Sequence, residues 1–402
     1  MKVAHRNMLI QGASFAKGFA FGTPLSVSEA LAERNHDTVL VIKRNDTLES
    51  IEAVCALCAP RAAILEGFSP YSHQHWLCSY YDVPAISLRE EQILELPRTK
   101  IFLDLETGSI SFGERDDDER SSVKPEVPKH FPLDGNRSNL PRKEIRVFAQ
   151  INAPSDVGIA VSQGCDGFGE IKSSIVEHGL GKITITAAKI IEEIRKVDRN
   201  PDLIPVRFFD ASPSHIGDHS VVDGTANSAL GIRGVRLFGA EPSAIGLFLE
   251  SLSDIRQNDF VVVLPMVNTI SELKTAKFAL SLPTARTGVQ FETPMSCLSA
   301  DELLSEAAFG IIGLNDLTQY TTAWDRNRYH EEFTPHSTLL PQVVALAKNV
   351  CLSAKHRGVT VAIAVDLYPT DQLAADIHEI SPDAVVVSPR RIKQWKKILG
   401  VG

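Results

Sequence analysis

Two carboxylates in the second half of the chain stand where a metal ion could be held. Glu292 ends the apolar run GVQFE, and Asp316 directly follows the run FGIIGLN. Mg²⁺ prefers a small number of carboxylate oxygens together with water and substrate oxygens. Glu292 and Asp316 are therefore predicted to bind Mg²⁺, or Mn²⁺ in its place, if the fold brings the two runs side by side.

Arginines follow other apolar runs and suit an anionic ligand. Arg207 lies within IPVRFF, Arg233 directly precedes GVRLF, and Arg326 lies in the loop after Asp316. A planar guanidinium can hold a phosphate or a carboxylate through two parallel hydrogen bonds. With Asn315 as a further donor to a phosphoryl oxygen, the set predicts a site for a small phosphorylated acid.

Each of these residues also has an ordinary explanation when it is taken alone. An arginine at the end of a strand is usually a solvated or ion-paired surface group, and an aspartate after a strand often caps the next helix. The same holds for Asp210, Arg236 and Asp366, which also stand at or near the ends of apolar runs. The case for a site depends on whether all these runs end at one face.

From residue 145 onward, apolar runs alternate with helical stretches. Several runs are apolar almost throughout, which is typical of parallel strands buried on both faces. About eight strand–helix units over roughly 255 residues predict one (β/α)₈ barrel (a TIM barrel), whose functional residues stand at the C-terminal ends of the strands. A doubly wound open sheet is the alternative. The expected strands are 145–151, 167–171, 204–209, 234–238, 259–266, 288–292, 309–315, 359–365 and 383–388.

Residues 1–113 mix short strands and helices and predict a smaller domain. Strands are expected at 38–43 and 62–67, a capped helix after Asn45, and a hairpin at 100–112 with its turn at 106–108. Residues 114–144 are charged, rich in proline and poor in aliphatic side chains, as in a linker; a surface excursion of one domain is the alternative. The expected fold is therefore α/β, with a small domain (1–113), a linker (114–144) and a barrel (145–402).

The composition argues against several classes of function. The formal charge is −9 and the pI is about 5.8, which argues against a surface that binds nucleic acid or an anionic membrane. No stretch approaches the roughly 20 apolar residues of a membrane helix, and the N-terminus has no apolar core of signal-peptide length. The six cysteines are few for a disulfide framework and fit a reducing cytoplasm. Cys55 and Cys58 are expected to be buried thiols rather than a zinc or redox site.

One segment resembles a known family. GIIGLNDLTQYTTAWDRN (310–327) resembles the motif G-T-N-D-L-T-Q-Y…D-R of the phosphoenolpyruvate (PEP)-utilising enzymes, which include the first enzyme of the bacterial sugar phosphotransferase system, pyruvate phosphate dikinase and PEP synthase. SPYSHQHWLCSYYDVPAISL (69–88) resembles the family's phosphohistidine segment, with His73 at the family's spacing before Pro84. Other segments similar to the family's are 12–24, 104–112, 205–212, 227–236, 261–273, 288–294 and 385–393.

The resemblance implies roles for individual residues. It implies a swivelling N-terminal domain in which His73 carries a phosphoryl group taken from PEP, and a barrel in which Mg²⁺ on Glu292 and Asp316 neutralises charge on phosphate and enolate. His73 would exchange the group, in either direction, with a separate protein or small molecule. A homodimer through the barrel is a further expectation. The residues implied in catalysis or substrate binding are His73, Lys172, Arg207, Asp210, Arg233, Arg236, Asn315 and Arg326.

The sequence departs from the family where turnover is concerned. Ala364 stands where the family has a cysteine that protonates the enolate as a general acid. Lys172 and Ser174 stand at the arginine and glutamate of an R-T-E motif, and lysine lacks the planar fork of arginine. The family's G-G-D-K after Asp210 is replaced by residues 211–214, ASPS.

In the first domain Tyr71 replaces the usual threonine two residues before His73. The 402 residues also leave no room for a nucleotide-binding domain or a phosphocarrier-docking domain.

Three hypotheses remain for the function of the protein. A phosphotransferase needs His73, and a regulatory protein binds PEP or pyruvate without forming product. A lyase, aldolase or mutase for another keto acid would keep its activity without residues 1–113.

Overall fold

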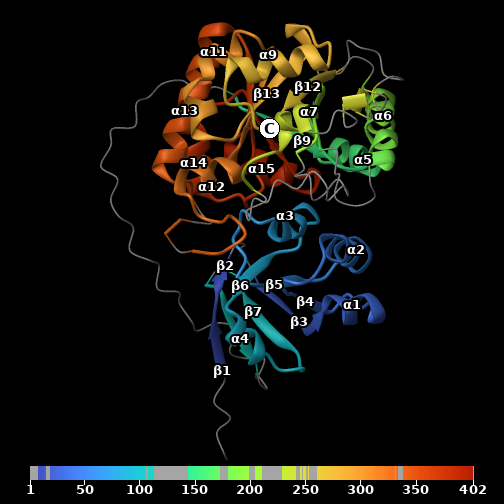
Figure 1. Cartoon of the computed structure of the whole chain (residues 1–402). Helices are drawn as coiled ribbons and strands as arrows, with labels where there is room; N and C mark the ends of the chain where they lie inside the picture. Colours follow the sequence, from blue (N-terminus) through green and yellow to red (C-terminus); the bar gives the residue numbers. More distant parts are fainter. Residues whose placement is uncertain are drawn as a thin grey trace, which may run out of the picture. The chain divides into compact units, whose positions relative to one another are not determined.

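The computed structural model shows the chain as two compact units, Met1–Phe68 with Val83–Lys143 and Ser69–Asp82 with Glu144–Gly402 (Figure 1). The expected linker lies outside the described residues except for Glu144. Among the described residues, no helix is both long and apolar enough to cross a membrane. The structure describes residues 8–14, 19–105, 107–112, 144–172, 180–198, 204–210, 229–240, 245–246, 248–249, 252, 260–330, 332–333 and 338–401.

The first unit is a mixed eight-stranded sheet with the order β1-β8-β7-β3-β4-β5-β6-β2. Strands β3 to β6 pair in parallel, and β7, β8 and β1 extend the sheet with antiparallel pairs. The strands are β1 (Met8–Gln11), β2 (Ala13–Ser14), β3 (Phe19–Ser26), β4 (Thr38–Ile42), β5 (Ala62–Glu66), β6 (Ala85–Leu88), β7 (Ile101–Asp104) and β8 (Ser109–Phe112); the helices are α1 (Val27–Glu33), α2 (Leu48–Cys58) and α4 (Glu90–Leu94).

The sequence predictions for this unit are confirmed where the structure describes it. The strands at 38–43 and 62–67 are β4 and β5, and the hairpin at 100–112 is the antiparallel pair β7–β8. Its turn includes Glu106, which lies outside the described residues. The helix expected after Asn45 is α2, and its cysteines Cys55 and Cys58 are buried and free of disulfides.

The second unit contains a closed barrel of eight parallel strands, in which β16 pairs with β9 to complete the ring. The expected TIM barrel is confirmed and the open sheet was wrong. Helices α9, α11, α13 and α14 lie outside the ring (Figure 1).

The strands of the barrel are β9 (Arg146–Ile151), β10 (Gly167–Lys172), β11 (Ile204–Arg207), β12 (Phe260–Leu264), β13 (Thr287–Phe291), β14 (Phe309–Gly313), β15 (Thr360–Ala364) and β16 (Ala384–Val387). The longer described helices are α3 (His73–Tyr80), α5 (Pro154–Ser162), α6 (Leu180–Val197), α9 (Ile270–Ala279), α12 (Leu314–Thr322), α13 (Pro341–Arg357), α14 (Asp371–Ile380) and α15 (Ile392–Leu399); the shorter ones include α10 (Pro294–Leu298) and α11 (Ala300–Leu304).

The barrel strands are buried on both faces, as their apolar runs predict. Side chains alternate along each strand, so Val263, Ile311 and Val386 belong to one apolar cluster, whereas their neighbours Val262 and Ile312 belong to the larger cluster that includes helix residues. Polar side chains are therefore concentrated where the strands end, which is where a barrel carries its site.

The strand expected at 234–238 was wrong. The segment forms a 3₁₀ turn, η4 (Gly234–Arg236), followed by the short helix α7 (Leu237–Ala240). Gly234 has a φ of +57°, and a Cβ at this position would lie 2.6 Å from the carbonyl oxygen of Pro265. The amide of Val235 donates to the same oxygen at 3.2 Å. The backbone therefore turns at Gly234 against the end of β12, and only glycine tolerates both the conformation and the close approach.

Candidate active site

Three carboxylates from different strands meet at the C-terminal end of the barrel. Asp210 lies three residues after β11, Glu292 directly follows β13, and Asp316 is in the first turn of α12 after β14. One oxygen of each lies within 4.8 Å of the others. Glu292 is fully buried and Asp316 nearly so. The structure therefore brings together the two carboxylates expected to bind a metal, and it adds Asp210 to them.

Two buried arginines bind these carboxylates. Arg233 donates from Nε and Nη2 to the two oxygens of Asp210, at 2.9 and 2.6 Å. Its Nη1 donates to Oδ1 of Asp316 at 3.2 Å and to the hydroxyl of Tyr320 at 3.1 Å. Arg326 donates from Nη1 to the other oxygen of Asp316, at 2.5 Å. Asp316 is thus held between two guanidinium groups, which offset the cost of burying its charge away from water.

His73 lies at the same cluster. It is the first residue of α3, whose N-cap Ser72 accepts a hydrogen bond from the amide of His75. Its Nε2 is 2.7 Å from Nη2 of Arg326. A guanidinium can only donate, so a hydrogen bond at this contact requires Nε2 to accept, with the ring proton on Nδ1. The nitrogen with the lone pair therefore faces the buried arginine.

The surroundings shift the acidities of the two buried ligand candidates in opposite directions. Burial, together with the charges of Asp210 and Asp316, raises the pKa of Glu292 well above its usual range. Burial also opposes the ionisation of Asp316, but Arg326 and Arg233 outweigh it and lower the pKa of Asp316 to about 2. The cluster therefore contains charged Arg–Asp pairs beside one carboxyl group that favours its proton.

The donor set fits a small divalent cation. Oε1 of Glu292 accepts from the amide of Met266 at 2.7 Å, whereas the buried Oε2 has no hydrogen-bond partner within the described part of the chain. Oxygens of three carboxylates within reach of one another are the ligands that Mg²⁺ and Mn²⁺ prefer. Asp210 and Asp316 are paired with arginines, so a cation would share or displace these ion pairs.

Two further expected residues contact neighbouring strand ends. Nε of Arg207 lies 3.7 Å from Oε1 of Glu170, and although burial disfavours its charge, Glu170 and the three clustered carboxylates raise the pKa of Arg207. Nδ2 of Asn315 donates to Oδ2 of Asp366 at 2.9 Å.

The structure does not bring all expected residues to the cluster. Lys172 ends β10 in register with Arg207, but its side chain lies outside the described parts. Nε of Arg236 donates to Glu272 on α9 at 3.3 Å, its Nη1 donates to the carbonyl of Gly231 at 3.0 Å, and its side chain is partly exposed. Arg236 therefore serves a neighbouring helix in this structure.

Two residues of the site were missed from the sequence. Glu170 is fully buried on β10, with a φ of +26° at an irregular pairing between Gly169 and Ile171. Its signal was a charged residue inside the apolar run GFGEI. Tyr320 donates to the carbonyl of Ala229, and burial raises its pKa to about 12. Its signal was its place one helical turn after Asp316.

Comparison with known proteins gives one family match. The model of the "PEP-utilising enzyme, PEP-binding domain" matches residues 136–400, a range that contains all the carboxylates and arginines above but not His73. The probable phosphoenolpyruvate synthase of Archaeoglobus fulgidus is 27% identical over 306 residues, covering 69% of this chain and 39% of that protein.

Two further relatives have a similar level of identity. The multiphosphoryl transfer protein of Xanthomonas campestris pv. campestris is 26% identical over 254 residues, covering 59% of this chain and 30% of that protein. The phosphoenolpyruvate-protein phosphotransferase of Streptomyces coelicolor is 26% identical over 319 residues, covering 75% and 57%. The chain thus spans between 30% and 57% of the length of these three relatives.

Proposed function

The chain belongs to the family of PEP-utilising enzymes, and from this premise we propose that it is a phosphotransferase that moves a phosphoryl group between PEP, or a related phosphorylated enol or keto acid, and His73. A separate protein or small molecule would be the acceptor or donor. The observation that carries the proposal is the 2.7 Å contact between Nε2 of His73 and Arg326, which also binds Asp316. This contact supports the proposal, because a histidine nitrogen beside a guanidinium could act as the nucleophile next to the charges that phosphoryl transfer needs.

The arginines would hold the substrate. PEP carries a phosphate and a carboxylate, and each can accept two parallel hydrogen bonds from one guanidinium. Arg207 ends β11, Arg233 lies in the connection between β11 and β12, and Arg326 follows α12. Each of the three contacts a carboxylate of the site. Asn315, which now donates to Asp366, would turn its amide to a phosphoryl oxygen. Lys172 at the end of β10 would add a further positive charge.

The three carboxylates Asp210, Glu292 and Asp316 would hold Mg²⁺ or Mn²⁺, which when bound supplies positive charge to the phosphate and enolate oxygens. Glu292 contributes an oxygen that no described residue uses. Asp316 would keep its place through Arg233 and Arg326, which bind it from two sides.

In the chemical step, the lone pair on Nε2 of His73 attacks phosphorus in line with the bridging oxygen. The N–P bond forms as the P–O bond breaks, and the electron pair of that bond leaves on the enolate of pyruvate. Arg326, next to Nε2, stabilises the charge on the transferring group. The enolate then takes a proton at C3 from water, because Ala364 at the end of β15 has no proton to donate. A second in-line displacement would pass the group to the acceptor.

Labelling tests this proposal directly. The protein is incubated with Mg²⁺ and PEP labelled in the phosphoryl group, and acid-labile protein label is followed together with pyruvate. We expect label in the wild type and in His75→Asn, which removes the other histidine of the segment, and none in His73→Ala or Asp316→Ala. Label that persists in His73→Ala, or a wild type that binds PEP by calorimetry without taking label, would refute the phosphotransferase.

A second candidate, binding of PEP or pyruvate without turnover, is favoured by one observation. The buried end of β15 carries Ala364 rather than a proton donor, so the barrel lacks the acid that the family resemblance led us to expect there. This candidate predicts PEP binding with no label on His73 and no pyruvate. The calorimetric arm of the same experiment distinguishes the two.

A further inference from the structure

Tyr71, two residues before His73, is buried in the apolar core of the barrel. It is 1% exposed, is among the largest fully buried side chains, and belongs to the same apolar cluster as Val262 and Leu317. Burial raises the pKa of its phenol, so the hydroxyl stays protonated. Leu317 of the same cluster lies on α12, the helix that carries Asp316. Tyr71 therefore shares one apolar core with the helix of a site carboxylate.

Tyr80, seven residues after His73, is tied to a different strand end. It is 4% exposed, and its hydroxyl donates to Oδ2 of Asp156. Asp156 is itself buried and also accepts from the amides of Asn152 and Ala153, at 3.2 and 2.8 Å, where α5 begins after β9. Burial and the charge of Asp156 raise the pKa of Tyr80. The phenol is thus a neutral donor to a carboxylate that the backbone already fixes.

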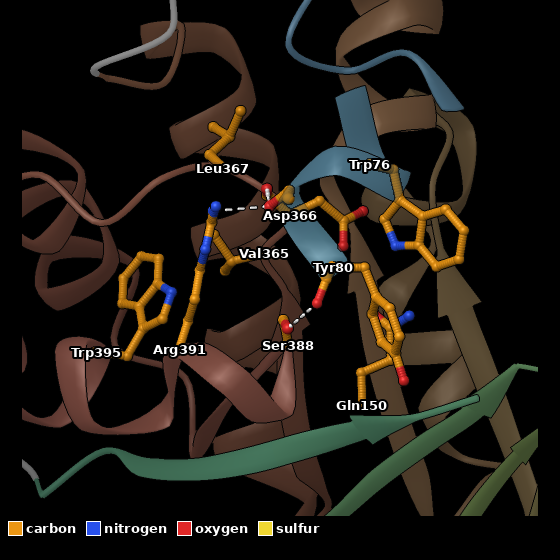
Figure 2. Close-up of a pocket in the computed structure, with 10 residues that line it drawn as sticks. Trp76, Tyr80, Gln150, Val365, Asp366, Leu367, Ser388, Arg391 and Trp395 are labelled. Atoms are coloured by element: carbon orange, nitrogen blue, oxygen red, sulfur yellow. Dashed lines mark hydrogen bonds between the residues drawn. The ribbon is translucent and has the colours of Figure 1, made fainter. Parts of the chain in front are cut away.

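The end of the helix α3 is held by further polar contacts. Ser388 donates to the carbonyl of Tyr80 at 2.8 Å, and Ser79 donates to the carbonyl of Asp366 at 2.6 Å. Figure 2 shows side chains of Tyr80, Asp366, Ser388 and Arg391 lining one pocket. Arg391, 3% exposed, donates to Ser79 at 2.8 Å and to Asp82 at 3.1 Å. These contacts reach the loops after β15 and β16.

His73 lies between these two attachments. Before it, Tyr71 fills a place in the core, and Ser69 donates to the carbonyl of Arg326 itself. After it, Tyr80 is hydrogen-bonded to Asp156. His73 is an exposed residue whose Nε2 contacts Arg326. The place of its ring therefore depends on this contact and on the backbone that carries it.

We infer that Tyr71 and Tyr80 are positioning residues, which hold residues 69–82 on the barrel and thereby set the distance between Nε2 of His73 and Arg326. The structural part of this inference stands without the phosphotransferase, and the catalytic part rests on the proposed function. The family that this segment resembles has threonine at the position of Tyr71, and a threonine side chain cannot fill the same part of the core.

Hydrogen exchange tests the attachment without any substrate. Amide exchange of peptides covering 69–82 is compared in the wild type, Tyr80→Phe, Asp156→Asn and the double variant. Losing a buried hydrogen bond to a charged group should speed local exchange about tenfold in each single variant, and the double variant should be no faster than the faster single one. Effects that multiply in the double variant would overturn the attachment. As a matched control, Thr287→Val removes another buried barrel hydroxyl, which donates to the carbonyl of Pro283 at 2.9 Å at the start of β13, and should leave these peptides unchanged.

Single-turnover labelling tests the positioning. At saturating PEP we expect the rate of His73 labelling to fall about tenfold in Tyr80→Phe, with the PEP dissociation constant unchanged, and Thr287→Val to change neither. Tyr71→Phe keeps the ring in the core and should label at nearly the wild-type rate, whereas Tyr71→Thr should label slowly. An unchanged rate in Tyr80→Phe and Tyr71→Thr, or a parallel loss of PEP binding, would overturn the role. A wild type that takes no label would instead refute the proposed function, while the exchange experiment would still decide the attachment.

Discussion

Nε2 of His73 lies 2.7 Å from Nη2 of Arg326. The other terminal nitrogen of the same guanidinium donates to Asp316, so one rigid planar group connects the candidate nucleophile with a candidate metal ligand. A cation that binds Asp316 would weaken its bond to Arg326 and make this guanidinium available to a phosphoryl group beside Nε2. Metal binding and phosphoryl transfer are therefore expected to depend on each other through Arg326.

This link predicts the effect of Arg326→Lys. Lysine keeps the positive charge but cannot donate to two partners in the fixed directions of a guanidinium, so the labelling rate of His73 should fall about a hundredfold. Rapid-quench measurement with labelled PEP would check it. Arg328→Lys is the matched control, because Arg328 is exposed and pairs only weakly with Asp325. Equal rates in the two variants would contradict a role for the guanidinium.

Metal binding should depend on the three carboxylates. Glu292→Gln and Asp316→Asn each replace one charged oxygen ligand by a neutral one, so the dissociation constant of Mn²⁺ should rise at least about tenfold. Electron paramagnetic resonance of free Mn²⁺ during titration measures it without substrate. Asp325→Asn, at an exposed carboxylate three residues before Arg328, should leave Mn²⁺ binding unchanged. If Glu292→Gln binds Mn²⁺ as the wild type does, the acidic cluster is not the metal site.

The same two substitutions should have opposite effects on stability. The pKa of Glu292 is raised in the folded protein, so the folded state binds more protons than the unfolded state above pH 4.5 and loses stability as the pH rises. In metal-free buffer, the melting temperature of Glu292→Gln should therefore exceed that of the wild type by a margin that grows above pH 4.5. The pKa of Asp316 is lowered to about 2, so its stabilisation is complete above pH 3.8, and Asp316→Asn should be less stable than the wild type at neutral pH. A melting temperature of Glu292→Gln below that of the wild type would show that Glu292 is ionised and that neighbouring groups compensate its charge.

The turn that presents Arg233 should depend on Gly234. In Gly234→Ala the positive φ costs about 1 kcal/mol, and the new Cβ would meet the Pro265 carbonyl at 2.6 Å. Gly164 has a φ of +75° with no atom within 4 Å of its Cβ position, so Gly164→Ala measures the backbone cost alone. Thermal unfolding should show a larger loss in Gly234→Ala, by about 1–3 kcal/mol. Similar losses in the two variants would show that the backbone moves away from Pro265 at little cost.

The sequence was informative where one rule connects residue type with position. Apolar runs buried on both faces predicted the barrel, and polar residues after these runs predicted that Glu292 and Asp316 would meet, because parallel strands end at one face. The rule failed at 234–238, where an apolar run forms a turn at Gly234, and at Arg236, whose partner Glu272 lies on another helix. Such partners depend on tertiary packing, which spacing along the chain does not contain.

Glu170 and Tyr71 show a second limit. Glu170 is directed by a positive φ inside a strand, a conformation that no sequence pattern for a strand would suggest. Tyr71 was noted only as a departure from threonine, and its burial in the barrel core could not be expected from a segment that resembles part of another domain.

The missing proton donor can be tested by restoring it. Ala364 is the last residue of β15, is paired with Gly313 at the end of β14, and is 8% exposed, so a cysteine there would bring a thiol to the mouth of the barrel. If the enolate is formed and waits for a proton from water, a general acid beside it should raise the rate of pyruvate formation in Ala364→Cys at least about tenfold.

Ala362→Cys is the matched control for this prediction and should not raise the rate. Ala362 lies two residues earlier on the same strand, in the same interior cluster, and is fully buried. The change is measured as the rate of pyruvate formation, either in the steady state with a saturating acceptor or in a single turnover without one. No gain in Ala364→Cys, with His73 still labelled, would mean that water protonates the enolate fast enough or that another side chain already serves as the acid. The search would then turn to the carboxyl group of Asp366, two residues after Ala364, which accepts from Asn315.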